Sequence, residues 1–453
     1  MNQKSTALLA VIVLFLLAWP LSAGDANYQS YFGARTLALN GLFIAGSDGI
    51  MANMVNPASA AYLEGAALDL SLLAKIGEYS FNNNVQGVFH SFRKEDLTFG
   101  LGGYWNLTPG WVISLGYLPV LDYFVDWPYA MVLGSDASEV LLTFNMNNKI
   151  QTHALTFDIA FRTGMFAFGL ALNAYQVSQV MNFPKTTADW QGSSTLDAAY
   201  QFTYDQEAWT YGINLGVSAD VSRNMRISAL LHSAYQAKMK GDAVSDMFQD
   251  LAQADTTAGT RLPPAMTGIQ TEFDFPWMAG AGVVWKVSEN LQLNFDLMLA
   301  LWDFSIDTKP GFEASGFRGM SVQFDDRAWT EGMSQTDTLT GITPARLVLP
   351  SRNALEAGIG LEYASSPELV LRAGYRYSQS PNIPQTYQLA FPTVSQHWVS
   401  AGIGYKEENY MVDISVAYGF GVTQTIGRAD NTYFYGDYQA GTFIPAVSLK
   451  YGL

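Results

Sequence analysis

The sequence has 453 residues, with 24 Lys and Arg, 40 Asp and Glu, and no cysteine. Only 14% of the residues are charged, whereas 49% are hydrophobic and 14% are aromatic. Long disorder is excluded because it requires low hydrophobicity and few aromatics. Disulfides and thiolate sites are excluded because cysteine is absent. The net charge of −16 argues against a nucleic-acid partner, because proteins bind phosphates through Lys and Arg.

The first residues have the pattern of an export signal. Lys4 makes the start basic, residues 7–19 form an apolar run, and small residues precede Gly24. This order predicts a signal peptide over residues 1–23. The alternative, an N-terminal membrane anchor, is disfavoured because the apolar run is too short to span a bilayer comfortably. No later window resembles a membrane-spanning helix.

The remaining chain alternates apolar and small or polar residues. The pattern is clearest over 209–217, 291–301, 355–363 and 410–418. A period of two predicts β-strands, because successive side chains point to opposite faces. The apolar face would be the core of a soluble sandwich or the lipid-facing wall of a membrane barrel.

The lengths of the connections favour the membrane barrel. Short and long connections alternate along the chain, as expected for tight periplasmic turns and longer outer loops. The short ones are 162–164, 220–224, 287–290, 365–368 and 406–409, and the long ones are 178–208, 237–277, 303–351, 379–395 and 421–442. A soluble sandwich has no reason to place every long loop at one end.

The strand segments predict the size of the barrel. Segments from residue 150 onward, together with 66–76, 84–92 and 97–120, make about 14 strands. This count places a periplasmic turn at 93–96 and an outer loop at 121–149. The predicted fold is therefore all-β, a transmembrane antiparallel β-barrel of about 14 strands over residues 66–453.

Residues 24–65 do not alternate and are rich in glycine and small residues. A barrel of about 14 strands is too wide for its own side chains to fill. We therefore expect residues 24–65 to form an N-terminal hatch that plugs the lumen.

Several motifs resemble one family. The stretches Gly33-Ala34-Arg35, 41–45 and Asn56-Pro57-Ala58 resemble the N-terminal hatch of the outer-membrane long-chain fatty-acid and hydrocarbon transporters (FadL/TodX, OMPP1 type). Segments 371–381 and 398–405 resemble strands of the same family. The resemblance implies a barrel in the outer membrane of a Gram-negative-type bacterium, and a monomer.

The resemblance also implies a function and a mechanism. Family members import hydrophobic molecules passively, here long-chain fatty acids or aromatic hydrocarbons. The hatch rearranges, with Asn56, Pro57 and Ala58 as the gating motif, and an inward kink in the third strand lets the ligand leave sideways. Candidate kink residues are Pro109, Gly110 and Pro119, because proline interrupts a strand ladder. The alternative for Pro109-Gly110 is an ordinary turn.

Three arginines are candidate anchors for a ligand carboxylate. Arg372 and Arg376 face the lumen by strand phase, and Arg35 lies in the predicted hatch. Bidentate hydrogen bonds would suit a carboxylate. The favoured alternative pairs them with Glu356, Glu362 or hatch acids, because an unpaired charge in the lumen would be costly.

Enzyme activity is not expected. The four histidines show neither triad nor metal-ligand spacing, so we expect no catalytic residue, metal or cofactor. The expected partners are a hydrophobic small molecule, outer-membrane lipid and the barrel-insertion machinery. Two other functions remain open, a surface shuttle or anchor for secreted proteins and a general porin.

Overall fold

The structure is a computed structural model. It describes residues 33–39, 41–46, 49–50, 54–82, 88–92, 94–133, 140–186, 199–247, 265–302, 319–324, 347–387, 389–430 and 435–453. The predicted signal peptide, residues 1–23, lies outside the described residues, as do residues 24–32 and a few later positions of the predicted hatch.

The described residues are almost entirely strands. The strands are β1 (Ala66–Asn82), β2 (Val88–His90), β3 (Lys94–Thr108), β4 (Trp111–Leu133), β5 (Val140–Thr163), β6 (Phe166–Thr186), β7 (Ala199–Ser222), β8 (Met225–His232), β9 (Tyr235–Met247), β10 (Ala265–Phe275), β11 (Trp277–Lys286), β12 (Leu291–Leu301), β13 (Gly319–Phe324), β14 (Leu347–Pro350), β15 (Ala354–Ala364), β16 (Leu369–Ser378), β17 (Gln396–Glu407), β18 (Tyr410–Gly421), β19 (Gln424–Ile426) and β20 (Gly436–Gly452). The helices are α2 (Ala34–Ala38), η1 (Pro57–Tyr62) and η2 (Pro384–Thr386). Among these described elements, no helix is long and apolar enough to cross a membrane.

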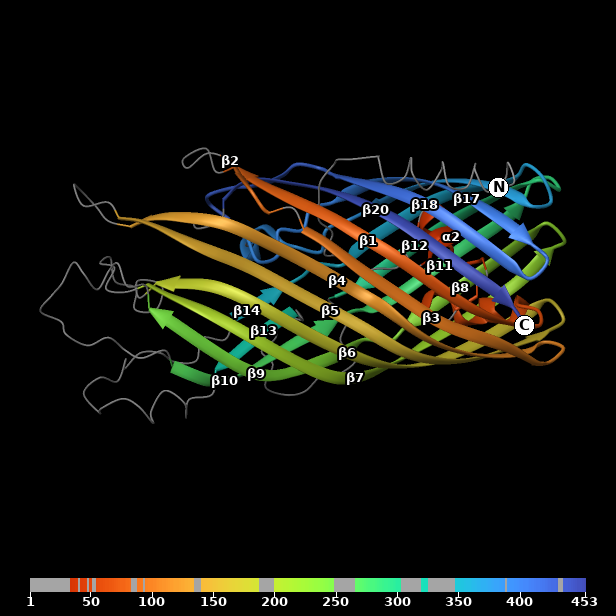
Figure 1. Ribbon diagram of the computed structural model, residues 1–453, viewed down its shortest axis with the longest axis horizontal. Helices are drawn as coiled ribbons and strands as arrows, with labels where there is room; N and C mark the ends of the chain where they lie inside the picture. The colour runs from red at the N-terminus through yellow and green to blue at the C-terminus, as the bar shows by residue number, and fades with distance from the viewer. Residues whose placement is uncertain are drawn as a thin grey trace, which may run out of the picture.

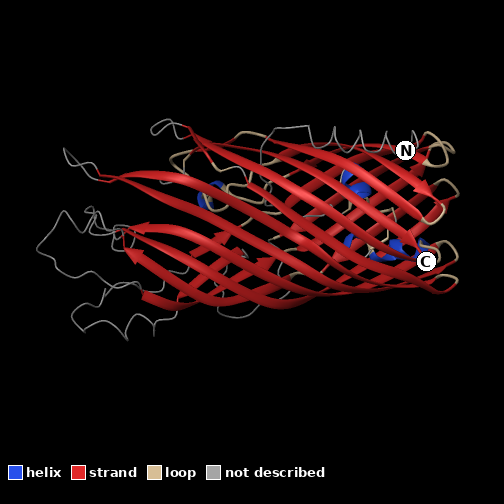
Figure 2. Ribbon diagram, viewed as in Figure 1, coloured by secondary structure: helices blue, strands red, loops and turns tan. Residues whose placement is uncertain are grey.

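The strands form one closed antiparallel barrel (Figures 1 and 2). β1 pairs with β20, so the first and last strands close the ring. Within the described residues the sheet has 20 segments, six of which continue a neighbour after a break, and the barrel therefore has 14 strands. The continued pairs are β2/β3, β8/β9, β10/β11, β12/β13, β14/β15 and β18/β19. The predicted fold class is confirmed.

The two faces of the wall differ as the alternation predicted. In β1, Leu68, Leu70 and Leu72 are exposed on the outside, whereas Ser71 and Leu73 are buried on the inside. A continuous exposed apolar face would be a liability in water, but it is the normal lipid-facing surface of an outer-membrane barrel.

Two predicted connections in the first third of the barrel are wrong. Residues 94–96 are not a turn, because they pair with residues 75–77 of β1, and Lys75 lies opposite Asp96. Residues 121–149 are not one outer loop, because β4 and β5 pair with each other as far as Leu133 and Val140. Each error has a physical reason. Charged residues at 94–96 suggested a turn, but Asp96 is paired with Lys149 of β5 within the barrel. Residues 118–123 of β4 are all buried, so the alternation of buried and exposed side chains is lost there.

Candidate functional site

The described N-terminal residues before β1, which we call the N-terminal segment, lie inside the barrel ring (Figure 1). Its helix α2 contacts β16, β17, β18 and β20, whereas η1 contacts β4, β5, β6 and β7. Only a segment that crosses the lumen can reach both of these wall regions. Most of its apolar side chains are fully buried there.

The Asn56-Pro57-Ala58 motif forms the tightest part of the segment. The Asn56 side chain accepts a hydrogen bond from the Ala58 amide at 3.1 Å and donates one to the Ile44 carbonyl at 2.9 Å. It thereby caps η1, as Asn commonly caps a helix, and ties two stretches of the segment together. The Val55 carbonyl lies 3.0 Å from Nε2 of His232 on β8.

The wall opposite this motif has two paired positions without side chains. Gly169 of β6 and Gly216 of β7 are register partners. A Cβ at Gly216 would lie 2.0 Å from the Asn56 carboxamide oxygen, and a Cβ at Gly169 would lie 2.2 Å from the Pro57 carbonyl carbon. The motif therefore packs directly against the backbone of this glycine pair, which we call the glycine seat. Sequence reasoning missed it, although glycines at paired lumen-facing positions were the available signal.

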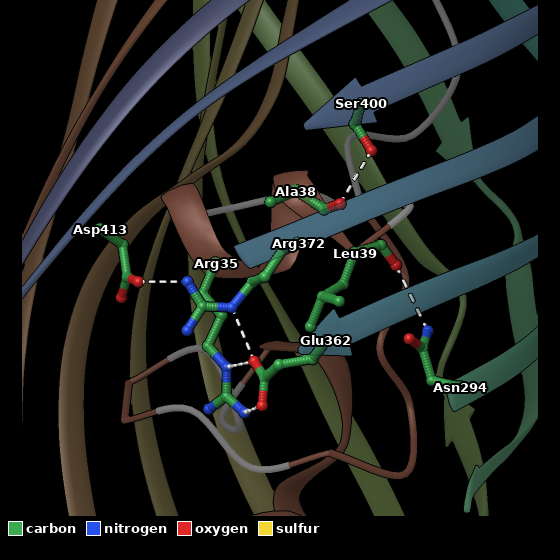
Figure 3. A network of polar contacts seen from close by, with 8 residues as sticks. All are labelled: Arg35, Ala38, Leu39, Asn294, Glu362, Arg372, Ser400 and Asp413. Atoms are coloured by element: carbon green, nitrogen blue, oxygen red, sulfur yellow. Dashed lines mark hydrogen bonds and ion pairs between the residues drawn. The ribbon is translucent and has the colours of Figure 1, made fainter. Parts of the chain in front are cut away.

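Side chains of the wall also hold the backbone of the segment (Figure 3). Asn294 of β12 donates to the Leu39 carbonyl at 3.3 Å, and Ser400 of β17 donates to the Ala38 carbonyl at 3.0 Å. Asp296 accepts from the Ile44 amide at 2.8 Å. These bonds satisfy buried backbone groups that regular secondary structure does not pair.

The three predicted arginines all contact acids. Arg372 donates to Glu362 at 2.6 Å and to Asp413 at 2.5 Å, and Arg35 donates to the same Glu362 at 2.9 and 3.1 Å (Figure 3). The structure places Arg376 3.4 Å from Glu356 and 5.0 Å from the ring of Trp398. The arrangement is the paired alternative: Arg35 links the N-terminal segment to the wall through Glu362, whereas Arg372 and Arg376 also join neighbouring wall strands.

Replacing Glu362 tests the importance of this network. Glu362→Gln removes the carboxylate that Arg35 and the buried Arg372 both bind and leaves Arg372 with Asp413, so we expect the free energy of unfolding to fall by about 3–5 kcal/mol. Urea unfolding of the detergent-solubilised barrel measures the change. Glu368→Gln, in the exposed turn after β15, is the matched control and should change stability little. Equal stability of both variants would show that the network contributes nothing.

A cavity of about 830 Å³ lies at the end of the barrel that carries the short turns. It is lined by Tyr62 of η1 and by Arg162, Asp220 and Arg226 of the wall, among others. The Tyr62 ring lies between Arg226, at 3.2 Å, and Arg162, at 4.7 Å. Burial raises the pKa of Tyr62 despite these two cations. Because Asp220 bonds both arginines, at 2.7 and 2.9 Å, this cluster fastens the end of the segment.

The wall is open between β3 and β4. Their ladder runs from Thr108 and Trp111 to Leu101 and Tyr117 and goes no further among the described residues. Beyond the contact of the Phe99 and Tyr117 rings, whose centroids are 5.8 Å apart, the next backbone hydrogen bond among the described residues is from the Phe92 amide to the Asp126 carbonyl, at 2.7 Å. Between these points the described residues of β3 pair only with β1, and those of β4 pair only with β5. The opening lies at the third strand of the barrel.

The inward course of β4 creates this opening. Residues 118–123 are all buried, whereas a wall strand would expose every second side chain. The register against β5 shifts between Pro119 and Leu121, so Val120 is an extra residue. A proline and a bulge are common causes of such a bend. Pro109 and Gly110, by contrast, form the turn between β3 and β4, with φ of 88° at Gly110. The prediction of a kink there is wrong, because the break is a hairpin turn that only glycine accommodates easily.

The connection between β16 and β17 folds back onto the bent strand. Tyr123 donates to the Ala390 carbonyl at 2.9 Å, and Trp127 donates to the Leu389 carbonyl at 2.8 Å. Asn148 of β5 also donates to Ala390, at 3.0 Å. Sequence reasoning treated 379–395 only as an outer loop, because nothing local indicates that it fills the lumen beside β4.

The bond from Trp127 gives a direct test of this packing. Trp127→Phe removes the donor and leaves the buried Leu389 carbonyl without it, so the free energy of unfolding should fall by about 1–3 kcal/mol. The control is Trp285→Phe on the exposed outer face of β11. Thermal unfolding in detergent compares the two. A loss in the control as large as in Trp127→Phe would argue against a specific role for the bond.

Comparisons with known proteins agree with this architecture. A family model described as outer membrane protein transport protein (OMPP1/FadL/TodX) matches residues 125–451. A search of curated proteins found no match. Among solved structures, the Pseudomonas putida toluene transporter TodX is 16% identical with a TM-score of 0.71, covering 94% of this chain and 99% of its own.

Two further solved structures are similar. A Pseudomonas aeruginosa FadL homologue has 14% identity and a TM-score of 0.68, with 96% of this chain and 99% of that chain covered. The Ralstonia pickettii toluene transporter TbuX has 14% identity and a TM-score of 0.67, with 94% and 99% covered. At these identities the likeness supports the fold, and the family match covers most of the chain. The protein therefore belongs to the OMPP1/FadL/TodX family of outer-membrane transport proteins and lies in the outer membrane.

Proposed function

We propose that the protein imports hydrophobic molecules passively and releases them sideways through the opening between β3 and β4. The inward bend of β4 at residues 118–123 is the observation that carries this proposal. It provides a route from the lumen to the membrane that an intact wall would lack.

The energetics favour a lateral route. Each CH₂ group taken from water into an apolar environment gains about 0.8 kcal/mol. Release of a long chain into the aqueous periplasm would therefore be unfavourable, whereas passage into the bilayer keeps the chain in apolar surroundings. The exposed leucines and aromatics on the outer wall support this end point.

The N-terminal segment would act as the hatch of this transporter. It is held by single hydrogen bonds and by an ion-pair network rather than by strand pairing. Such contacts can break and re-form without opening the barrel. We propose that Asn56, Pro57 and Ala58 move when the hatch rearranges, because they rest on a glycine seat without interlocking side chains.

Two substrate classes fit this proposal, long-chain fatty acids and aromatic hydrocarbons. TodX and TbuX are toluene transporters, which supports the second class for this chain. The arginines bound to acids offer no free carboxylate anchor in this conformation, which weakens the first.

Uptake by cells with and without the protein tests the function. Radiolabelled toluene and a radiolabelled long-chain fatty acid are supplied separately, and initial uptake rates are compared. Faster uptake of either compound in cells with the protein supports import and identifies the class. If neither compound enters faster in cells with the protein than in cells without it, and the barrel is detected in the outer membrane, the proposal is overturned. A shuttle role would then be favoured, and copurification with a secreted partner would test it.

A further inference from the structure

The opening between β3 and β4 is lined by polar side chains where the barrel should present lipid. Lys149, Gln151 and His153 of β5 occupy every second position, in line with the exposed Leu155 and Phe157. This is the lipid-facing register of the strand, in which polar and charged residues are costly. Three such residues in sequence therefore require an explanation.

The bend of β4 explains how they are accommodated. With β4 displaced inward, the inner face of β3 comes to lie against the outer face of β5. Lys149 approaches Asp96 of β3 at 2.9 Å, and Gln151 donates to Asp96 and to Asp122 of β4, both at 3.3 Å. The polar cluster thus bridges the two edges of the opening.

The remaining members complete a site without net charge. Lys75 of β1 donates to the Asp122 carbonyl at 2.7 Å, so two lysines face two aspartates. The His153 ring stacks on Tyr117 at 5.4 Å. Its Nδ1 is buried and has no hydrogen-bond partner within the described part of the chain. A buried polar atom without a partner is uncommon and indicates an unfilled hydrogen-bonding position.

An apolar groove begins where the polar residues end. It has a volume of about 570 Å³ and runs over the outer face of β4 to β7. On the outer face of β4, Leu115 is the next residue beyond Tyr117 in the direction away from the polar cluster. On the outer face of β5, Leu155 is likewise the next residue beyond His153. The groove is lined by Leu115, Leu155, Phe157, Leu172, Tyr211 and Ile213, among others. A polar cluster joined to an apolar track matches a molecule with one polar head and one apolar tail.

We propose that the wall opening is a binding subsite for a lipophile with a neutral hydrogen-bonding head, such as a fatty alcohol. The head hydrogen-bonds to Lys149 and Gln151 beside Asp96 and Asp122, which keep their partners, and the tail lies in the groove. Balanced charges favour a neutral head over an ionised one, because an added charge would remain uncompensated. This inference rests on the proposed lateral release and adds to it a preference for the ligand head.

Photolabelling of the full chain in lipid nanodiscs tests the subsite. The two probes are a linear fatty alcohol with a diazirine in its chain and the same diazirine chain without the hydroxyl. Labelled residues are identified by mass spectrometry. We expect the alcohol to label Leu115, Leu155 and Phe157 about tenfold more than the headless probe does, the effect of one well-placed polar contact. Equal labelling would show that the groove holds only bulk lipid chains and would overturn the proposal.

A variant identifies the head contacts. In Lys149→Met with Gln151→Met, labelling by the alcohol should fall to the headless level. The matched control, Lys240→Met with Gln176→Met, changes the same residue types on β9 and β6 and should keep the preference. Retention of the preference in the first variant would overturn the assignment of the head site. If that variant does not fold, the two-probe comparison on the unaltered chain still decides.

The labelling experiment and the uptake experiment can give negative results independently of each other. Labelling is measured at equilibrium and needs no uptake, so the absence of a head preference would overturn the subsite and leave lateral release intact. Unchanged uptake after the opening is closed by a crosslink would overturn lateral release and leave the labelling result intact.

Discussion

Uptake should fall to the level of cells lacking the protein when the edges of the wall opening are tied together. Asp96→Cys and Gln151→Cys place two thiols where side-chain atoms are 3.3 Å apart across the opening. The chain contains no other cysteine, so a short bis-methanethiosulfonate reagent reacts only there. If ligands leave sideways, the tether lies in their route and blocks it sterically, so uptake is lost. Initial uptake of the radiolabelled compound measures the loss.

The tether is reversible, which supplies the main control. Reductant should restore uptake to the rate of the untreated double-cysteine variant, and the reagent should leave the uptake of each single-cysteine variant at its own untreated rate. Thiols at Ala373→Cys and Ala401→Cys, exposed register partners on β16 and β17 far from the opening, control for crosslinking of the wall itself. Full uptake with the opening tethered would rule out lateral release, and the ligand would then have to leave through the periplasmic end.

A methyl group at Gly216 should displace the N-terminal segment without preventing barrel formation. The Cβ of Gly216→Ala would lie 2.0 Å from the Asn56 side chain, and alanine is acceptable in a strand, so the clash falls on the segment. Overpacking of this kind costs about 1–3 kcal/mol, which would raise the population of the displaced segment about 5- to 150-fold. Ion conductance in planar bilayers should rise accordingly, because the lumen is then less well filled.

Gly419→Ala is the matched control for this variant. Its Cβ would lie 2.8 Å from the Trp398 ring, so it is crowded by a wall side chain instead of the N-terminal segment. Barrel formation is checked for both by heat-modifiable migration in gels. Equal conductance in Gly216→Ala and the unaltered protein would show that the glycine seat does not hold the plug in place.

Several features of the barrel were predictable because they are local. Period-two alternation identified most strands from residue 150 onward, and the alternation of short and long connections separated a membrane barrel from a sandwich. The outer ends of the strands were missed, because β10, β13, β14, β19 and most of β9 lie in stretches predicted as long loops. The errors fall where tertiary contacts changed the pattern. Lys94 to Asp96 read as a turn because of their charges, yet they pair with β1. The bend of β4 buries both faces and erased the alternation that would have revealed a strand.

The site was less predictable than the fold. The sequence alone identified the N-terminal segment as non-barrel and named Asn56, Arg35, Arg372 and Pro119 as residues of interest. It left open whether the arginines contact acids or are free for a ligand, because that depends on distances between strands remote in the chain. It also could not indicate that Gly169 and Gly216 face each other beneath the motif.

One physical reason separates the features that the sequence determined from those that depended on the tertiary structure. Alternation and turn chemistry depend on neighbouring residues, so the sequence by itself determined an all-β, exported, membrane-facing barrel with a separate N-terminal segment. The wall opening, the folded-back connection at 379–395 and the polar cluster at Asp96, Asp122, Lys149 and Gln151 depend on which strands meet. Only the closed barrel, with β4 bent inward, brings those residues together, and the tertiary structure therefore decided where the wall is open.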